Sequence, residues 1–203
     1  MIDFFTEQYK NTSNWHILLE FIVFVSGILS VYFAKKENIL VYPVGLIATI
    51  ITVYLLYKAQ YFADMSINIY FSIMSIYGWY NWKKKENEPL LKISKTTLLE
   101  KLKGFLLFIS TIIFTYCVYI YFDYSVKLIN YIDIFTSGIF FSAMWFMALK
   151  KIENWTLWII GNLIAIPLFA YRGLGMLSLQ YLIFTILAIM AYREWNKILQ
   201  NKT

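Results

Sequence analysis

The sequence predicts an all-α integral membrane protein with seven transmembrane helices, and three observations support this. Hydrophobic residues make up 60% of the chain and charged residues only 15%, whereas a soluble domain carries roughly a quarter charged residues. The apolar residues fall in blocks and not in the one-sided stripes of a soluble helix. Polar segments, most of them short, join the blocks, as expected of a multi-pass chain whose main solvent is lipid.

Seven apolar blocks have close to the roughly 17–25 residues that a helix needs to cross a bilayer. They cover about residues 15–34, 39–57, 62–82, 104–122, 131–149, 155–171 and 175–192. The longest joint, residues 83–103, contains Pro89 and seven lysines, and we expect it to be a cytoplasmic loop. It divides the chain into three spans, one span and three spans. Residues 1–203 are therefore expected to form a single transmembrane domain.

The distribution of basic residues predicts the orientation of the chain. The segments on one side of the expected membrane hold 14 of the 18 Lys and Arg residues, and those on the other side hold four. Because basic residues gather in cytoplasmic loops, we expect the N-terminus outside and the C-terminus in the cytoplasm. The same bias accounts for the formal net charge of +6, so we expect membrane lipid and no nucleic acid as a partner.

The two groups of three spans share a motif. Six residues separate residues 35–38, Lys-Lys-Glu-Asn, from Gly45, and six residues separate residues 151–154, Lys-Ile-Glu-Asn, from Gly161. Both copies begin on the lysine-rich side, so the two groups cross the membrane in the same direction. Parallel repeats of this kind build transporters such as the SWEET facilitators. We therefore expect a SWEET-like, 3+1+3 parallel-repeat arrangement.

Several reaction classes need residues that the chain lacks. His16 is the single histidine, so the sequence offers neither a Ser-His triad nor a His, Cys and carboxylate cluster for a metal. Cys117 is the single cysteine, which excludes a disulfide within the chain. No glycine-rich loop ending in Lys-Ser or Lys-Thr is present to bind nucleotide phosphates. We expect no enzyme activity, no catalytic residue, no metal and no cofactor.

Three amide side chains are expected near the middle of the membrane. Asn162 lies about seven residues in from the lysine-rich side, and Asn68 and Gln180 lie about six or seven residues in from the other side. Asn68 and Gln180 occupy comparable places in the third span of each group. Amides donate and accept hydrogen bonds at once, which suits ribose hydroxyls or a carboxamide. In the alternative interpretation each amide only bonds a neighbouring helix, which contributes about 0.6 kcal/mol.

Aromatic side chains are expected to complete the site. Trp155, Trp158 and Asn162 have the spacing i, i+3 and i+7, which places them on one face of a helix. Aromatic faces stack on flat rings and attract cations. Tryptophans of the interfacial aromatic belt are the alternative interpretation. The candidate substrate-binding residues are Trp155, Trp158, Asn162, Gln180, Asn68, Trp145 and Tyr42.

Acidic residues of the expected spans lie near the side opposite the lysines, at Glu20, Asp64 and Asp133. No acid pair of the kind used in proton relays is found at mid-membrane, which favours passive facilitation over ion coupling. An acidic entrance favours a cationic or neutral solute. The alternative is that these carboxylates are simply solvated.

Several motifs, in one order along the chain, resemble the PnuC family of bacterial vitamin transporters. They are Trp155-x-x-Trp158-x-x-x-Asn162 after Lys-Ile-Glu-Asn, Tyr61-Phe62-Ala63-Asp64 leading into Tyr77-Gly78-Trp79-Tyr80-Asn81-Trp82, and Gly173-Leu174 leading to Gln180-Tyr181. The resemblance covers about residues 20–196. Two positions depart from the family's pattern: Asn68 stands where many relatives have Gln, and Trp145 stands where a polar residue is expected.

The resemblance implies a seven-span facilitator in the bacterial cell inner membrane that moves nicotinamide riboside, thiamine or riboflavin. It also implies facilitated diffusion, with trapping of the vitamin by a cytoplasmic kinase, and family members are often homotrimers. Family members hold the substrate between tryptophan rings and polar side chains, which here correspond to Trp155, Trp158, Asn162 and Gln180.

We expect nicotinamide riboside as the substrate, and its phosphorylated form to be refused, because the spans contain no deep Lys or Arg. Thiamine is the alternative, because a cationic thiazolium suits the same aromatic rings, and riboflavin comes third. A second alternative is a non-transporting membrane subunit or receptor, in which the amides serve only helix packing.

Overall fold

The computed structural model describes residues 12–58, 62–83, 91–121 and 127–201. Within them the chain forms α2 (Asn14–Lys35), α3 (Val41–Lys58), α4 (Phe62–Trp82), α5 (Leu98–Tyr121), α6 (Leu128–Ala148), α7 (Glu153–Tyr171) and α8 (Gly175–Gln200). The prediction of an all-α membrane protein is confirmed, since six of these seven helices are long and apolar enough to cross a membrane. Pro89, Tyr61 and the side chain of Asp64 lie outside the described residues.

Two helices, α5 and α8, extend beyond the expected spans by six residues or more. Helix α5 begins at Leu98, six residues before the expected start at 104, because Thr97 and Glu100 cap it. The Thr97 N–H donates to Glu100 Oε2 at 2.8 Å, and the Glu100 N–H donates to Thr97 Oγ1 at 3.3 Å, as in a capping box. Helix α8 continues to Gln200, so its last turns extend past the expected end of its span at 192.

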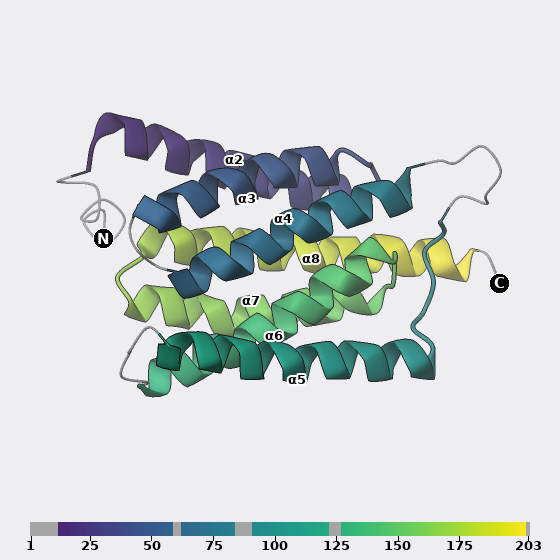
Figure 1. Cartoon of the computed structure of the whole chain (residues 1–203). Helices are drawn as coiled ribbons and strands as arrows, with labels where there is room; N and C mark the ends of the chain where they lie inside the picture. Colours follow the sequence, from purple (N-terminus) through teal and green to yellow (C-terminus); the bar gives the residue numbers. More distant parts are fainter. Residues whose placement is uncertain (1–11, 59–61, 84–90, 122–126, 202–203) are drawn as a thin grey trace.

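The helices run side by side along one long axis (Figure 1). Helices α2, α3 and α4 pack in sequence as one triplet, and α6, α7 and α8 pack as the other. The triplets meet crosswise, α2 against α8 and α4 against α6, so the third helix of each triplet contacts the first helix of the other. Helix α5 lies at the edge of the bundle, against α6 (Figure 1).

The close contact between α5 and α6 depends on small residues. A Cβ at Gly104 would lie 2.5 Å from the ring of Phe146, and a Cβ at Gly138 would lie 2.8 Å from the ring of Phe108. The Ser142 hydroxyl donates to the Gly104 carbonyl at 2.9 Å. Small residues and hydroxyls are the usual means by which helices associate in lipid. Helix α5 is thereby fixed to the second triplet.

A shift of 113 residues relates the two triplets. It carries α2 onto α6, α3 onto α7 and α4 onto α8, with starts and ends that agree within one residue except for the longer end of α8. The turns agree too, since Glu37 and Lys150 have the left-handed φ values of 53° and 51°. The motif in the sequence had suggested a shift of 116 residues, which is wrong by almost one helical turn. Gly45 is therefore matched by Trp158, and not by Gly161.

Candidate functional site

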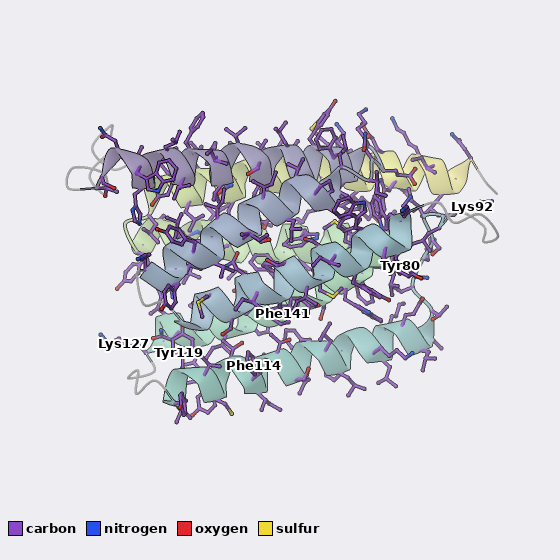
Figure 2. The ribbon with its side chains drawn as sticks, turned by 45° about the horizontal axis from the view of Figure 1, so that its top comes forward. Tyr80, Lys92, Phe114, Tyr119, Lys127 and Phe141 are labelled. Carbon is purple, nitrogen blue, oxygen red and sulfur yellow. The ribbon has the colours of Figure 1, made fainter. Side chains whose placement is uncertain are left out.

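A cavity of about 1070 Å³ lies between the two triplets. All six helices of the triplets contribute to its lining, and α5 adds Tyr119. The lining extends from His16, near the start of α2, to Met147, near the end of α6. We call these the His16 end and the lysine-rich end. Figure 2 shows Tyr119 and Lys127 at the first end, and Tyr80 and Lys92 at the second.

Six of the seven candidate residues line this one cavity. They are Tyr42, Asn68, Trp155, Trp158, Asn162 and Gln180. The seventh, Trp145, is not among the lining residues. Its ring packs on the neighbouring Phe146, with centroids 5.1 Å apart. The structure therefore brings together side chains from α3, α4, α7 and α8 that are up to 138 residues apart in the sequence, between 42 and 180.

Four lining residues carry a buried polar atom that has no hydrogen-bond partner in the described part of the chain. These atoms are Tyr42 Oη, Trp155 Nε1, Trp158 Nε1 and Asn162 Oδ1. A buried polar atom without a partner costs about 1–3 kcal/mol, so unpartnered atoms are rare in folded proteins. Asn162 is 1% exposed, and its Oδ1 accepts no hydrogen bond from a described residue. This oxygen therefore does not form the interhelical hydrogen bond of the alternative interpretation. Four such atoms beside one cavity indicate a place for a polar solute.

Gln180 and Asn68 differ from Asn162. The Gln180 amide donates to the Phe24 carbonyl at 3.3 Å, which ties α8 to α2. A Cβ at Gly27 would lie 2.9 Å from Gln180 Nε2, so this glycine makes room for the amide. At the shift of 113 residues, Gln180 corresponds to Ile67 and not to Asn68, so the two amides are one residue out of register. Both nevertheless line the cavity.

An aromatic wall lies on the second triplet's side of the cavity. The ring of Phe140 stacks on Trp158, with centroids 5.2 Å apart, and on Tyr181, at 5.9 Å. Tyr181 also stacks on Phe169, at 5.1 Å and an angle of 8°. Phe140 belongs to no motif of the sequence, and Tyr181 stands in one only as the neighbour of Gln180. With 17 Phe and 17 Tyr in the chain, no local signal distinguishes a lining ring from one in contact with lipid.

The two triplets contribute unequally to the cavity. Trp158, Asn162 and Gln180 correspond to Gly45, Thr49 and Ile67 in the first triplet, and all six residues line the cavity. The repeat therefore accounts for the cavity itself. The differences between the copies place the large aromatic ring and two of the amides on one side of it.

Charged residues line the His16 end of the cavity. Asp133 on α6 accepts hydrogen bonds through Oδ2 from Arg172 Nη2 and from Tyr119 Oη, both at 3.1 Å. Glu20 on α2 lines the same end and is the repeat counterpart of Asp133. Arg172 is the one Lys or Arg among the described residues of the lining. Since Arg172 pairs with Asp133, the carboxylate of Glu20 makes the described lining of this end net negative.

The lysine-rich end of the cavity is closed by packed aromatic rings. Tyr42 and Trp155 are each 1% exposed, and Trp195 is fully buried. Two indole N–H groups join the triplets here: Trp82 Nε1 donates to the Met147 carbonyl, and Trp195 Nε1 donates to the Lys35 carbonyl, both at 3.3 Å. We call Tyr42, Trp82, Trp155 and Trp195 the aromatic plug.

Ion pairs between the triplets surround the aromatic plug. Lys150 Nζ lies 3.1 Å from Glu37 Oε2 and 4.4 Å from the centroid of the Trp82 ring. Lys35 Nζ lies 3.2 Å from Glu194 Oε1. Lys150 is 5% exposed, so these two contacts replace the water that its ammonium group loses on burial. Rings and ion pairs together hold this end of the cavity shut.

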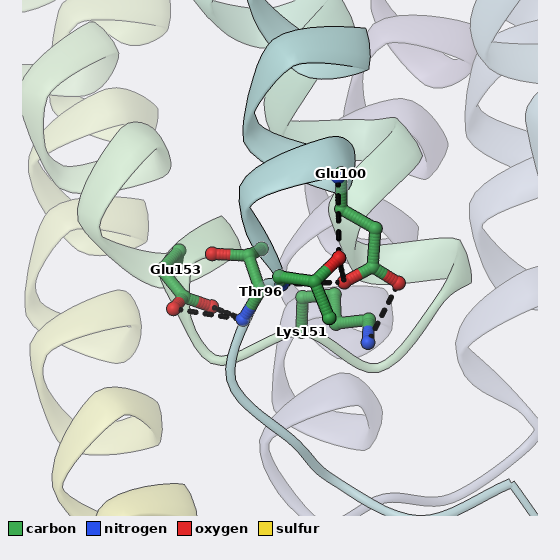
Figure 3. A network of polar contacts seen from close by, with 5 residues as sticks. Thr96, Glu100, Lys151 and Glu153 are labelled. Atoms are coloured by element: carbon green, nitrogen blue, oxygen red, sulfur yellow. Dashed lines mark hydrogen bonds and ion pairs between the residues drawn. The ribbon is translucent and has the colours of Figure 1, made fainter.

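The segment before α5 crosses the turn between α6 and α7 (Figure 3). Ser94 forms a bridge to this turn, as its N–H donates to the Lys150 carbonyl at 3.1 Å and its carbonyl accepts from the Ile152 N–H at 3.0 Å. The Thr96 N–H donates to both carboxylate oxygens of Glu153. Lys151 Nζ lies 2.8 Å from Glu100 Oε1. We call residues 94–97 the strap. The strap fixes the turn that precedes Trp155 and Trp158 on α7.

Comparisons with known proteins agree with this architecture. The model of a family described as nicotinamide mononucleotide transporter matches residues 17–197. The nicotinamide riboside transporter PnuC of Escherichia coli (strain K12) is 27% identical over 195 residues, which cover 84% of this chain and 82% of that protein. Its namesake in Neisseria mucosa is 24% identical over 206 residues, which cover 94% and 75%. The crystal structure of the vitamin B3 transporter PnuC has the same fold, with a TM-score of 0.73, 21% identity, and coverage of 95% of this chain and 85% of that chain.

Proposed function

Because the chain belongs to the family of nicotinamide mononucleotide transporters, we propose that it imports unphosphorylated nicotinamide riboside across the bacterial inner membrane. The family is one of membrane transporters and not of enzymes. Two relatives that match over most of their length are named for the riboside. The observation that carries the proposal is the group of four unpartnered polar atoms beside the aromatic wall.

The unpartnered atoms fit a carboxamide on a flat ring. The indole N–H groups of Trp155 and Trp158 require acceptors, and Asn162 Oδ1 requires a donor. A carboxamide offers a carbonyl oxygen to an indole and N–H groups to the asparagine. The pyridinium ring that bears it is flat and cationic, and so stacks well on Trp158 and Phe140. Each contact uses a side chain that the fold already places against the cavity.

The charges of the cavity favour the riboside over the mononucleotide. A phosphate carries nearly two negative charges and is usually met by Arg or Lys. Arg172 is already paired with Asp133, and Glu20 adds a negative charge at the same end. The mononucleotide would thus meet an uncompensated carboxylate, whereas the cationic riboside is attracted by it.

The positions of the charges support the proposal of facilitated diffusion. Glu20, Asp133 and Arg172 lie toward the His16 end, and the described lining offers no pair of acids at mid-depth for a proton relay. We propose that the triplets rock about the cavity, with the His16 end outside, the aromatic plug on the cytoplasmic side and the C-terminus in the cytoplasm. A cytoplasmic kinase then traps the riboside as its phosphate.

Uptake into proteoliposomes tests the proposal. The wild-type protein is expected to take up labelled nicotinamide riboside until the concentrations inside and outside are equal, without dependence on a proton gradient. Enclosing a riboside kinase with ATP should convert this into accumulation. The mononucleotide should enter at least about 10-fold more slowly. Equal rates for the riboside and the mononucleotide would contradict the charge argument.

A pair of tryptophan variants ties uptake to the cavity. Trp158→Ala removes a lining ring and should raise the half-saturation concentration for the riboside about 10-fold or more, since stacking on an aromatic ring is worth about 1–3 kcal/mol. Trp79→Ala is the matched control, because Trp79 is 41% exposed on α4 and does not line the cavity. If both variants transport like the wild type, the ring of Trp158 does not hold the substrate. If the wild-type protein itself, assembled normally, takes up no riboside, the chain is better described as a membrane subunit or receptor.

Thiamine is the second candidate substrate. The carboxylate of Glu20 and the rings of Phe140 and Trp158 also suit a flat thiazolium cation. Competition by unlabelled thiamine and riboflavin for riboside binding to purified protein separates the three vitamins. Tighter binding of thiamine than of the riboside would transfer the assignment to thiamine and leave the transporter class unchanged.

A further inference from the structure

Asp133 is a buried carboxylate at the side of the cavity. It lies on α6, is 8% exposed and lines the cavity together with its partners Tyr119 and Arg172. The partners come from α5 and from the residue that follows α7, so three segments converge on one side chain. A carboxylate that accepts hydrogen bonds from a phenol and a guanidinium is fixed in position.

Both contacts of Asp133 use the same oxygen. Tyr119 Oη and Arg172 Nη2 each donate to Oδ2 at 3.1 Å, and no hydrogen bond or ion pair with a described residue uses Oδ1. An ionised carboxylate has about four acceptor positions on its two oxygens. Since Asp133 lines the cavity and its side chain is 12% exposed, Oδ1 can accept hydrogen bonds from a solute there.

The position of Asp133 suits the sugar of a nucleoside. The lining residues Asp133, Ser137 and Phe140 follow one another on one face of α6. Asp133 and Phe140 are seven residues apart, which is about 10 Å along the helix and comparable with the length of a nucleoside. A base that stacks against Phe140 and Trp158 therefore has its ribose toward Asp133.

We infer that Asp133 is the residue that selects for ribose, by accepting hydrogen bonds from the vicinal 2′ and 3′ hydroxyls of the substrate. The inference rests on the proposed function, because it takes the flat ring to bind at the aromatic wall. The charge of Arg172 compensates that of Asp133, so the pair suits a neutral diol better than a cation. Glu20, the repeat counterpart, has no ion pair with a described residue and acts instead on the overall charge of the solute.

Analogues without hydroxyls test the inference on the unmodified protein. Purified wild-type protein should bind nicotinamide riboside at least about 10-fold more tightly than its 2′,3′-dideoxy analogue, the factor expected for hydrogen bonds to a charged group. Equal affinities would overturn the inference while leaving the proposed function intact. Failure of the riboside itself to bind would count against the proposed function.

Variants of the ion pair then assign the preference to Asp133. In Asp133→Asn the preference for the riboside over the dideoxy analogue should fall below about 3-fold. The double variant Asp133→Asn with Arg172→Gln avoids leaving a buried guanidinium unpaired and should show the same loss. Tyr119→Phe keeps the carboxylate and should retain the preference. A purely structural role for Asp133 predicts equal weakening of both ligands in every variant, which would overturn the inference.

Glu20→Gln provides the control for charge. Removing this carboxylate should lower the affinities for the riboside and for the dideoxy analogue by the same factor, since both ligands carry the cationic ring. A selective loss of the riboside in Glu20→Gln, with none in Asp133→Asn, would assign the diol to the other triplet and overturn the inference.

Discussion

The ring of Tyr42 stands edge-on to the ring of Trp82, with centroids 5.2 Å apart and an angle of 89° between the planes. The second triplet repeats this contact 113 residues later, where Trp155 meets Trp195 at 5.4 Å and 87°. Each pair is anchored to the opposite triplet by an indole N–H. Opening the lysine-rich end therefore requires both halves of the aromatic plug to separate, which suits a rocking motion of two triplets.

Tyr42→Phe is expected to stabilise the conformation described here by about 1 kcal/mol, because it removes a buried hydroxyl that has no partner. Tyr70→Phe is the matched control. The Tyr70 hydroxyl donates to the Phe141 carbonyl at 3.0 Å, so its loss should destabilise by about 1 kcal/mol. Thermal unfolding in detergent measures both changes. A loss of stability in Tyr42→Phe would show that a water or a solute satisfies this hydroxyl.

Gly78→Ala is expected to displace the Tyr42 ring from the aromatic plug. A Cβ at Gly78 would lie 2.2 Å from that ring, and such overpacking costs about 1–3 kcal/mol. Gly45→Ala is the milder comparison, because its Cβ would meet the hydroxyl of Ser30 at 2.8 Å, where a rotation relieves the contact. We expect Gly78→Ala to lower the unfolding temperature more than Gly45→Ala and to increase leak of the riboside. The reverse order would show that the tyrosine ring moves aside freely.

The helical spans, and six of the seven residues expected beside one cavity, could be predicted from the sequence because both depend on local patterns. Apolar blocks fixed the spans, and the spacing of Trp155, Trp158 and Asn162 placed them on one helix face. The register of the repeat did not follow. The Lys-Ile-Glu-Asn motif matches Lys-Lys-Glu-Asn in composition, but the left-handed residue of each turn is Glu37 in one copy and Lys150 in the other.

The remaining parts of the site depend on contacts between distant segments. Phe140 and Tyr181 are two among many aromatic residues, and only the packing of α6 against α7 and α8 distinguishes them. The sequence left open whether Asp133 forms part of an acidic entrance or is simply solvated, and it gave no sign of a pairing with Arg172. Their pairing across α6 and α7 needs the tertiary fold.

Trp145→Ala is expected to leave the half-saturation concentration for the riboside within about 2-fold of the wild type. Its ring packs on Phe146 and does not line the cavity, so its loss should act on stability and not on binding. Trp158→Ala, measured in the same assay, should raise the half-saturation concentration about 10-fold. If Trp145→Ala weakens binding as much as Trp158→Ala, the substrate reaches beyond the described cavity.

Ser94→Pro is expected to release the strap. Proline has no N–H to donate to the Lys150 carbonyl, so it removes one of the two bridge hydrogen bonds and disturbs the other. Ser94→Ala keeps the backbone bonds and should behave like the wild type. Uptake rate and unfolding temperature should both fall for the proline variant only. Equal behaviour of the two variants would show that Glu153 and Glu100 hold the turn without the bridge.

Exchange of the charges of Glu37 and Lys150 tests whether their ion pair holds the lysine-rich end closed. Glu37→Gln leaves Lys150 nearly buried without its counter-charge, and we expect a loss of about 2 kcal/mol, below the 3–5 kcal/mol of a fully buried pair because Glu37 is partly exposed. If this pair stabilises the closed end, that end should open more readily in the variant. The rate of amide hydrogen exchange across residues 150–155 should then rise. The double variant Glu37→Lys with Lys150→Glu restores a pair of opposite charges between two residues that share the left-handed backbone conformation. The double variant should regain at least half of the stability lost in Glu37→Gln, and its rate of hydrogen exchange across residues 150–155 should fall again. The loss of stability in the double variant is compared with the summed losses in Glu37→Lys and Lys150→Glu. If the two are equal, the ion pair contributes no coupling, and the aromatic plug alone closes this end.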